Sequence, residues 1–277
     1  MVNDPGRVDL HAHTCFSDGL FTPEELVARA ARLGLAAVGV TDHDTVAGID
    51  RARAAGKRDG VEIVPGAELS CTVDGTDVHI LGYYIDCRDP DVTGFFADLR
   101  RARFDRAVKM VELLDGLGIR VTLEQVERSA TGAAVGRPHV AQAMVEAGAV
   151  GSMEEAFKRF LGYDGPAYVP KKRLTPEEAV GFIHRHHGVA VLAHPGIYRR
   201  DTALYAAIGA GVDGIEVWHP DHDTAESARL FEVAEKNGLL VTGGSDCHGG
   251  RKKGHIYLGE VAVEYKYLAA IKRLARR

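Results

Sequence analysis

Short apolar segments alternate with helical patterns along most of this chain, and this alternation limits its fold more than any other feature of the sequence. An apolar segment at residues 7–13 is followed by a helical pattern at residues 22–34. Thr22, Pro23 and Glu25 predict a capping box at the start of that helix. Strands that alternate with helices form mainly parallel sheets, and roughly seven such units favour an α/β barrel over an open sheet.

Two segments interrupt this alternation. Asp74 and Gly75 lie between two strand patterns and predict a hairpin. The chain then becomes helical without convincing strands, and "TLEQVER" and "SMEEAFKRF" both begin like capped helices. We therefore predict a barrel domain over residues 1–95 and 168–277, with an inserted small helical subdomain over residues 96–167.

Charge and composition limit the partners of the chain. The net charge is −5 at pH 7 with neutral histidines, and there is no basic arm, so we expect no binding to duplex DNA. The four cysteines form no CxxC pair, and the N-terminus carries no apolar leader, which predicts a reduced, cytoplasmic protein. No apolar run approaches the length of a membrane span, so no membrane contact is expected. The sequence also gives no reason to expect an obligate protein partner.

Nearly every predicted strand ends in a side chain that can bind a metal ion. In α/β barrels the carboxyl ends of the strands converge on one face, where sites are built. The side chains in question are His11, His13, Asp42, His43, Glu68, His194, His219, Asp246 and His248, and the predicted hairpin strand begins with His79. Such a recurrence predicts a shared site at that face of the barrel.

The spacing of the first two histidines supports this interpretation. His11 and His13 stand two residues apart on a predicted strand, so their imidazoles point the same way. Neutral imidazoles in this arrangement can bind one metal ion. Glu68 and Asp246 would add oxygen ligands, and a carboxylate can bridge two ions. A further group is predicted from Asp18, His43 and His248.

This ligand chemistry indicates a kind of ion and a kind of reaction. Nitrogen and oxygen ligands without thiolates suit Mn²⁺, Fe²⁺ or Zn²⁺. We predict Mn²⁺ as the cofactor, with Fe²⁺ or Zn²⁺ as alternatives. Two or three such ions can activate water and neutralise phosphate oxygens during in-line displacement.

Each motif by itself also has an ordinary explanation. A lone HxH is usually a structural or surface pair, "TDHD" can cap a helix, and "SDCHG" can be a plain loop. Glu68 can be a buried carboxylate paired with an arginine. Together these explanations are poor, because they would leave many polar groups buried without partners, which is costly.

With these residues considered, the chain resembles the PHP family, the polymerase and histidinol phosphatase superfamily. The motifs that carry the resemblance are "DLHAHTCFSDG", "TDHDT", "PGAELSC", "VHILGY", "LAHPG" and "GGSDCHG", in this order. The resemblance spans the chain outside the helical insertion. It implies a distorted (β/α)7 barrel with a trinuclear metal site.

The resemblance also implies three groups of metal ligands. The first ion would be bound by His11, His13, Glu68 and Asp246. Glu68 would bridge to a second ion, whose other ligands would be His79 and His194. The third ion would be bound by Asp18, His43 and His248, with Asp18 at a position where relatives can carry His.

Within the superfamily, the helical insertion with "GRPHVAQAMV" resembles the branch that acts on nucleotide 3′,5′-bisphosphates. That branch releases the 3′-phosphate to give a 5′-nucleotide such as AMP, and it also trims short RNA from the 5′ end. The resemblance thus implies a small nucleotide or a short oligonucleotide as substrate. Two alternatives stay open: a histidinol-phosphate phosphatase, and a metal-binding regulatory module with little activity.

Further residues are predicted to contact substrate or take part in catalysis. Arg137 and His139 begin a helix after Gly136, where they would hold a second phosphate, although an ordinary helix start with a surface arginine explains them as well. His219 would line the pocket or orient ligands. Catalytic roles are predicted for His194, Asp246 and His248. One of the two histidines would give the leaving oxygen its proton.

The remaining candidates are weaker. Trp218 and Tyr198 would either stack on a base or belong to the core. The basic run 171–173 is predicted to be mostly solvated surface. Cys15 and Cys247 stand beside predicted ligands, but no histidine is left to activate them, so we expect both to be inert thiols.

Overall fold

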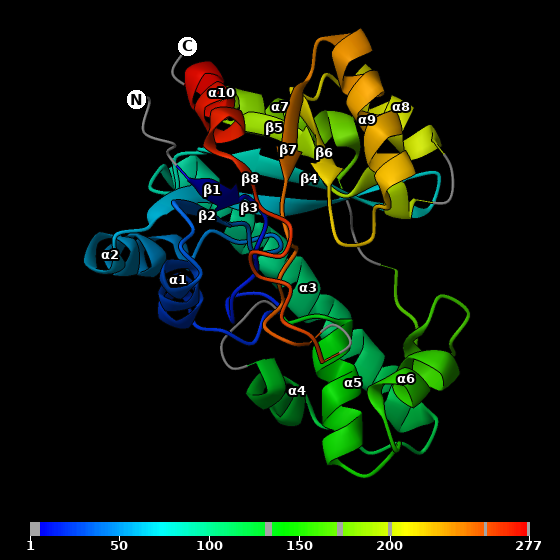
Figure 1. Cartoon of the computed structure of the whole chain (residues 1–277). Helices are drawn as coiled ribbons and strands as arrows, with labels where there is room; N and C mark the ends of the chain where they lie inside the picture. The colour runs from blue at the N-terminus through cyan, green and yellow to red at the C-terminus, as the bar shows by residue number, and fades with distance from the viewer. Residues whose placement is uncertain (1–5, 131–134, 171–173, 199–200, 252–253, 276–277) are drawn as a thin grey trace.

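A sheet of eight strands forms the centre of the computed structural model, which describes residues 6–130, 135–170, 174–198, 201–251 and 254–275. The strand order is β7-β6-β5-β4-β3-β2-β1-β8 (Figure 1). The strands are β1 (Arg7–Asp9), β2 (Ala37–Val40), β3 (Glu62–Val73), β4 (Thr76–Tyr83), β5 (Val189–Leu192), β6 (Gly214–Trp218), β7 (Leu240–Gly243) and β8 (Val263–Glu264).

The pairing pattern confirms the predicted distorted α/β barrel. Strands β1, β2 and β3 run parallel to one another, as do β5, β6 and β7. Strand β4 runs antiparallel to both of its neighbours, and the turn at Asp74 and Gly75 forms the predicted hairpin with β3. The short strand β8, which runs antiparallel to β1, brings the sheet to eight strands instead of the expected seven.

The chain segments that follow β1 and β7 nearly close the barrel. The Leu10 amide donates a hydrogen bond to the Gly243 carbonyl at 3.2 Å, and the His13 amide donates one to the Cys247 carbonyl at 2.9 Å. A Cβ atom at Gly244 would lie 2.4 Å from the Cβ of His11, so this close approach requires glycine. The closure brings two sequence-distant groups of predicted ligands side by side.

Helices cover the outside of the barrel, as Figure 1 shows. They are α1 (Pro23–Arg32), α2 (Ile49–Asp59), α7 (Pro176–Arg185), α8 (Thr202–Gly209) and α9 (Thr224–Asn237), with α10 (Tyr265–Ala275) at the C-terminus. The predicted capping box of α1 is present: Thr22 accepts from the Glu25 amide, and the Glu25 side chain accepts from the Thr22 amide. Leu268 and Ile271 of α10 are fully buried with strand residues such as Val8.

A second group of helices packs around its own apolar cluster, which includes Met110, Leu114, Val126 and Met144. This group consists of α3 (Pro90–Gly116), α4 (Leu123–Ala130), α5 (Arg137–Glu146), α6 (Met153–Ala156) and a π-helical turn (Phe157–Leu161). It lies below the barrel in Figure 1. Helix α3 joins the two parts, because its first turns pack in the barrel core while its later turns belong to this cluster. The exact domain division at residues 96–167 stays a prediction.

Some predicted element boundaries differ from the structure. Strand β1 ends at Asp9, and residues 10–13 pair instead with the segment after β7. Helix α2 begins at Ile49 instead of residue 45, because Asp44 adopts a left-handed conformation with φ 50° and its amide donates to the Glu68 carbonyl. The basic run 171–173 lies outside the described residues.

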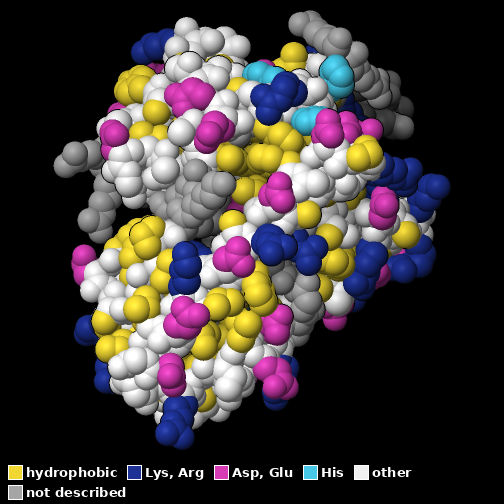
Figure 2. Space-filling view, turned by 180° about the vertical axis from the view of Figure 1, so that it is seen from behind, with side chains coloured by type: hydrophobic (Ala, Val, Ile, Leu, Met, Phe, Trp, Pro, Cys, Tyr) yellow, Lys and Arg dark blue, Asp and Glu magenta, His cyan; other side chains and the backbone are white. Residues whose placement is uncertain are grey.

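Acidic and basic side chains are interspersed over the face seen in Figure 2. All four cysteines are free thiols. Within the described ranges, no helix has both the length and the apolar character needed to cross a bilayer.

We expect Gly39→Ala to destabilise the barrel strongly. A Cβ atom at Gly39 would lie 2.1 Å from the Leu10 carbonyl oxygen, so the backbone just after β1 would have to move. The free energy of unfolding should fall by at least about 2 kcal/mol in urea titrations. Gly94→Ala is the matched control, because open space surrounds this position in α3. It should stabilise by up to about 1 kcal/mol, and equal effects of both variants would contradict the packing argument.

Candidate metal centre

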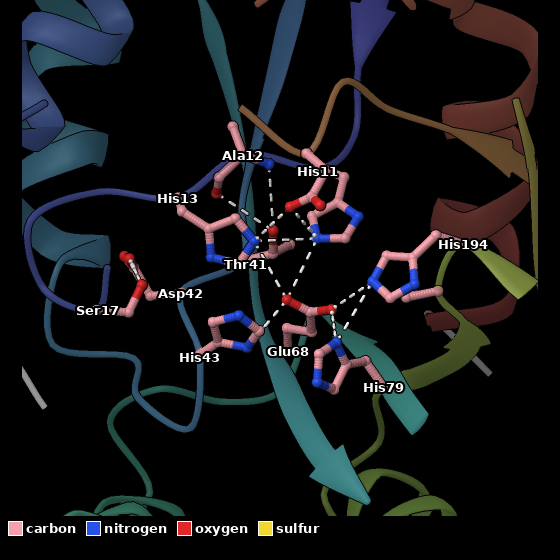
Figure 3. Close-up of polar contacts among 12 residues, drawn as sticks. His11, Ala12, His13, Ser17, Thr41, Asp42, His43, Glu68, His79 and His194 are labelled. Atoms are coloured by element: carbon pink, nitrogen blue, oxygen red, sulfur yellow. Dashed lines mark hydrogen bonds and ion pairs between the residues drawn. The ribbon is translucent and has the colours of Figure 1, made fainter. Parts of the chain in front are cut away.

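The carboxyl ends of several strands converge on one face of the barrel and bring the predicted ligands together (Figure 3). His11 and His13 follow β1, and His43 follows β2. Glu68 and His79 lie on the β3–β4 hairpin, His194 follows β5, and Asp246 and His248 follow β7. The side chains form three groups that could hold ions: His11, His13, Glu68 and Asp246; His43, Glu68 and His79; and His13, Asp18, His43 and His248.

The first group has the dimensions of a metal site. The Nε2 atom of His13 lies 3.0 Å from Asp246 Oδ1 and 3.2 Å from Glu68 Oε2. The Nε2 atom of His11 lies 3.4 Å from Glu68 Oε2, 3.5 Å from Asp246 Oδ1 and 3.1 Å from His13 Nε2. Ligand atoms bound tetrahedrally at about 2.1 Å stand roughly 3.4 Å apart. The buried donors therefore match the spacing that an ion requires.

Hydrogen bonds outside the group fix the tautomer of His11. Its Nδ1 atom lies 3.1 Å from Glu216 Oε1 and 3.2 Å from Glu216 Oε2, so Nδ1 carries the proton. In the neutral ring, the Nε2 lone pair then faces the oxygens of Glu68 and Asp246. Acceptors that face one another repel unless a cation lies between them, so the donor set fits a metal ion.

Glu68 connects the first group to the second. Its carboxylate is completely buried. One oxygen, Oε2, faces His11, His13 and His43, and the other, Oε1, lies 2.8 Å from His79 Nδ1 and 3.0 Å from His194 Nε2. The two oxygens thus face different sets of imidazoles, which is the arrangement that a bridging carboxylate requires.

The third group is wider. His248 Nε2 lies 3.2 Å from Asp18 Oδ1, whereas His43 Nε2 lies 3.9 Å from Asp18 Oδ2. The Nδ1 atom of His248 donates to the Asp246 carbonyl at 2.8 Å, which leaves its Nε2 lone pair facing Asp18. Asp18 Oδ1 has no hydrogen-bond partner among the described residues. This group fits an ion less tightly than the first.

The crowding of charges changes the pKa values of the site. Burial by itself raises the pKa of Glu68, but the imidazoles of His43 and His79 hold that pKa well below its usual range. Burial likewise opposes protonation of His13, yet the carboxylates of Asp246 and Glu68 raise its pKa to about 9. Burial lowers the pKa of His194 to about 4, and Glu68 offsets only part of this effect.

Two of the predicted ligands have a strained backbone. His194 has φ 32° and Asp246 has φ 48°, in the left-handed region that non-glycine residues rarely adopt. The His194 amide donates to Glu216 Oε2 at 2.8 Å, which stabilises its unusual conformation. Such strain of about 1–3 kcal/mol persists where the surroundings fix it, and it clusters at functional sites.

The structure adds residues that the sequence analysis missed. Glu216 on β6 is completely buried and orients both His11 and His194. Its signal in the sequence is a single acidic residue inside the apolar strand "GIEVW". Asp42, noted only as a strand end, accepts from Ser17 and from the Thr14 amide and so holds the loop that carries Asp18.

The predicted substrate contacts lie at different distances from this centre. His139 is buried at the start of α5, and its Nδ1 accepts from the Gly136 amide at 3.0 Å, so its Nε2 carries the proton. His219 is buried, and its Nε2 lies 3.5 Å from Asp246 Oδ2. Arg137 instead lies 4.0 Å from Asp77 and donates to the Leu161 carbonyl.

The two base-stacking candidates named from the sequence have other contacts. Trp218 packs against Phe231 and Tyr267. Tyr198 donates its hydroxyl hydrogen to the Ala193 carbonyl and accepts from the His79 amide. These contacts favour the alternative that both belong to the supporting structure.

We expect Glu216→Gln to weaken metal binding by about 10- to 100-fold, because the carboxylate no longer orients the His11 ring. A competition titration with a chromophoric chelator measures this change. Glu264→Gln, which alters an exposed carboxylate, should leave metal affinity unchanged. Equal affinity of wild type and Glu216→Gln would show that Glu216 does not tune the site.

Metal binding should release protons, and metal affinity should rise with pH. In the metal-free protein His13 gains a proton that stabilises the fold fully below pH 6.5, and this contribution is lost as the pH rises through about 9. A metal ion must displace that proton, so affinity should increase over the same pH window. Mn²⁺ titration with a pH indicator in dilute buffer measures the release.

His13→Ala should reduce the number of protons released, whereas His255→Ala, at an exposed histidine, should not. Metal binding that is independent of pH between 6.5 and 9 would contradict the assigned protonation state of His13.

Comparisons with known proteins agree with this geometry. The family model described as "PHP domain" matches residues 9–157. The 5′-3′ exoribonuclease Rnm of Escherichia coli is 37% identical over 247 residues, which cover 87% of this chain and 84% of the relative. The 3′,5′-nucleoside bisphosphate phosphatase of Chromobacterium violaceum is 34% identical over 259 residues, which cover 90% of this chain and 91% of the relative.

A solved structure gives the same assignment. A protein from Bifidobacterium adolescentis, to which a metal-dependent phosphoesterase activity is ascribed, is 35% identical and superimposes with a TM-score of 0.86 over 96% of both chains. Fold, ligand geometry and relatives therefore agree, and the chain belongs to the PHP domain family as a metal-dependent phosphoesterase.

Proposed function

We propose that this enzyme removes the 3′-phosphate from nucleotide 3′,5′-bisphosphates, leaving a 5′-nucleotide such as AMP, and that it trims short RNA from the 5′ end. The observation that carries the proposal is the Glu68 carboxylate, whose two oxygens face two separate sets of imidazoles. The names of the relatives support this choice of substrates, since one is a bisphosphate phosphatase and another a 5′-3′ exoribonuclease.

The donor set supports Mn²⁺ as the resident ion, with Fe²⁺ or Zn²⁺ as alternatives. The three groups offer imidazole nitrogens and carboxylate oxygens without a thiolate, which suits these ions. Glu68 would hold two ions together, one with His11, His13 and Asp246, the other with His79 and His194. Such ions stabilise negative charge on phosphoryl and leaving oxygens and lower the pKa of bound water.

The protein's own residues orient these ligands and hold protons. His194 and His248 direct Nε2 atoms toward Glu68 and Asp18, so both are committed to the metal groups. His219 accepts from the Asp221 amide at Nδ1, so its Nε2 carries the proton and donates toward Asp246. We therefore assign to His219 the role of holding a proton beside the reacting phosphate, in place of His194 or His248.

A second phosphate would be bound where α5 approaches the third group. Burial, assisted by the charges of Arg251 and Arg103, lowers the pKa of His139 to about 4. His139 is thus a neutral donor at Nε2, with two guanidinium groups nearby. The Nε atom of Arg251 is buried and has no hydrogen-bond partner within the described part of the chain. An anion beside His139 would supply that partner.

Arg137 is the arginine that the sequence predicted for the phosphate clamp. Its guanidinium already contacts Asp77 and the Leu161 carbonyl. We therefore favour Arg251 with His139 for the non-reacting phosphate, and Arg137 as a support for neighbouring rings. A direct role of Arg137 in binding phosphate stays a prediction.

The Mn²⁺-loaded enzyme should release phosphate from adenosine 3′,5′-bisphosphate at least tenfold faster than from histidinol phosphate. Only the bisphosphate carries a second phosphate that Arg251 can bind, and a hydrogen bond between charged groups contributes about 1.5–3 kcal/mol. Arg251→Ala should reduce the ratio of activity on the bisphosphate to activity on p-nitrophenyl phosphate by a similar factor. Metal analysis and phosphate-release kinetics provide the measurements.

The exposed arginine variant Arg58→Ala serves as the matched control and should keep the wild-type ratio. Faster turnover of histidinol phosphate would favour the histidinol-phosphate phosphatase. A metal-loaded protein inert towards every ester in the panel would favour a regulatory metal-binding module.

A further inference from the structure

An exposed aromatic ring stands on a rigid support at the edge of the helical insertion. Tyr163 is 53% exposed, and the Arg137 guanidinium lies over its ring, 5.2 Å from the centroid. The same guanidinium lies 5.6 Å from the Tyr168 ring and 5.8 Å from the Phe157 ring. We name Tyr163, Arg137 and Tyr168 together the tyrosine platform.

The contacts of Tyr163 restrict its motion without covering it. Its hydroxyl donates to the Asp77 carboxylate of the β3–β4 hairpin. Arg137 covers one ring face, and Tyr168 stands 5.3 Å away, ring centre to ring centre. With these contacts in place, Tyr163 is still 53% exposed to solvent. A ring held in this way loses little conformational entropy when a ligand stacks on it.

The hairpin connects the platform to the metal centre. Asp77 and His79 stand two residues apart on β4, so their side chains lie on the same face, about 7 Å apart along the strand. Ser70 and Thr72 on β3 pair with His79 and Asp77, and Glu68 continues the same face. One continuous hairpin face thus runs from the bridging carboxylate to the partner of Tyr163.

We propose that the tyrosine platform stacks the base of the nucleotide whose phosphate lies at the metal groups, and this inference rests on the function proposed above. Bases of single-stranded nucleic acid stack on aromatic rings and on arginine planes. The Arg137 charge beneath the ring strengthens the platform and favours a ligand that carries phosphates. Stacking tolerates every base, so the platform selects nucleotides over other phosphate esters without a strong sequence preference.

An alternative role for Tyr163 is a strut that ties the insertion to the hairpin through its hydroxyl. The two roles depend on different atoms. Stacking needs the ring, whereas the strut needs the hydroxyl that contacts Asp77. Tyr163→Phe and Tyr163→Ala therefore separate them.

The test compares kcat/KM for adenosine 3′,5′-bisphosphate with kcat/KM for ribose 3,5-bisphosphate, which lacks the base. Tyr163→Ala should lower this ratio about tenfold, mainly through KM, as expected for the loss of one stacked base. Tyr163→Phe should keep the ratio within twofold of wild type. Tyr205→Ala removes a similarly exposed tyrosine on α8 and should leave kcat/KM unchanged for both substrates.

Two results would overturn the proposal: an unchanged ratio in Tyr163→Ala, or an equal loss in Tyr163→Phe and Tyr163→Ala, which would assign the effect to the hydroxyl. Thermal unfolding of each variant checks that the fold is intact, and Tyr163→Leu, which keeps apolar bulk, replaces the alanine variant if that one unfolds.

A binding experiment tests the stacking proposal separately from the proposed phosphatase function. Calorimetry with adenosine 5′-phosphate and with ribose 5-phosphate measures the contribution of the base without any turnover. A wild-type preference for the adenosine compound that is lost in Tyr163→Ala supports the platform, even if no ester is hydrolysed. An absent preference contradicts it, even if both bisphosphates are substrates.

Discussion

The buried carboxylate of Glu68 is the group on which the arrangement of the metal centre depends. Its charge is removed from water completely, and a group in that position is tolerated only when opposite charges or donors surround it. Imidazoles from four other parts of the chain supply this environment: His11 and His13, His43, His79, and His194. These imidazoles come from different strands or from the segments that follow them, so the carboxylate is stabilised only when the barrel has formed.

The barrel meets this requirement by a close approach between the segments that follow β1 and β7. The segment after β1 pairs with the segment after β7, which places His11 and His13 against Asp246. The contact leaves no room for a side chain at Gly244. Behind the ligands, Glu216 fixes the rings of His11 and the backbone of His194, so the metal centre depends on a buried residue that would bind no ion itself.

The helical insertion adds a second set of side chains near the metal groups. The barrel contributes carboxylates and most of the imidazoles, whereas the insertion contributes Arg103, His139 and the ring of Tyr163 with Arg137 against it. Arg103 also joins the two sets directly, because it donates to Asp44 and to Ser70 beside the metal groups. A substrate between the two sets would have its phosphates near cations and its base on an exposed ring, and this division of roles distinguishes a nucleotide from a simple phosphate ester.

The sequence by itself determined the elements and the types of ligand. Apolar alternation, the capping box at Thr22 and the turn at Asp74 and Gly75 are local signals, because neighbouring residues produce them. The positions of His11 and Asp246 after their strands followed from the same periodicity, whereas the predicted strand end at Glu68 was wrong, because β3 continues to Val73 through its pairing with β4. Only the tertiary structure revealed the contacts of Glu216 and Tyr163 and the eighth strand. These contacts join residues far apart in the sequence: 205 residues separate His11 from Glu216, and 86 separate Asp77 from Tyr163. No local sequence pattern indicates that such distant residues meet in the folded chain.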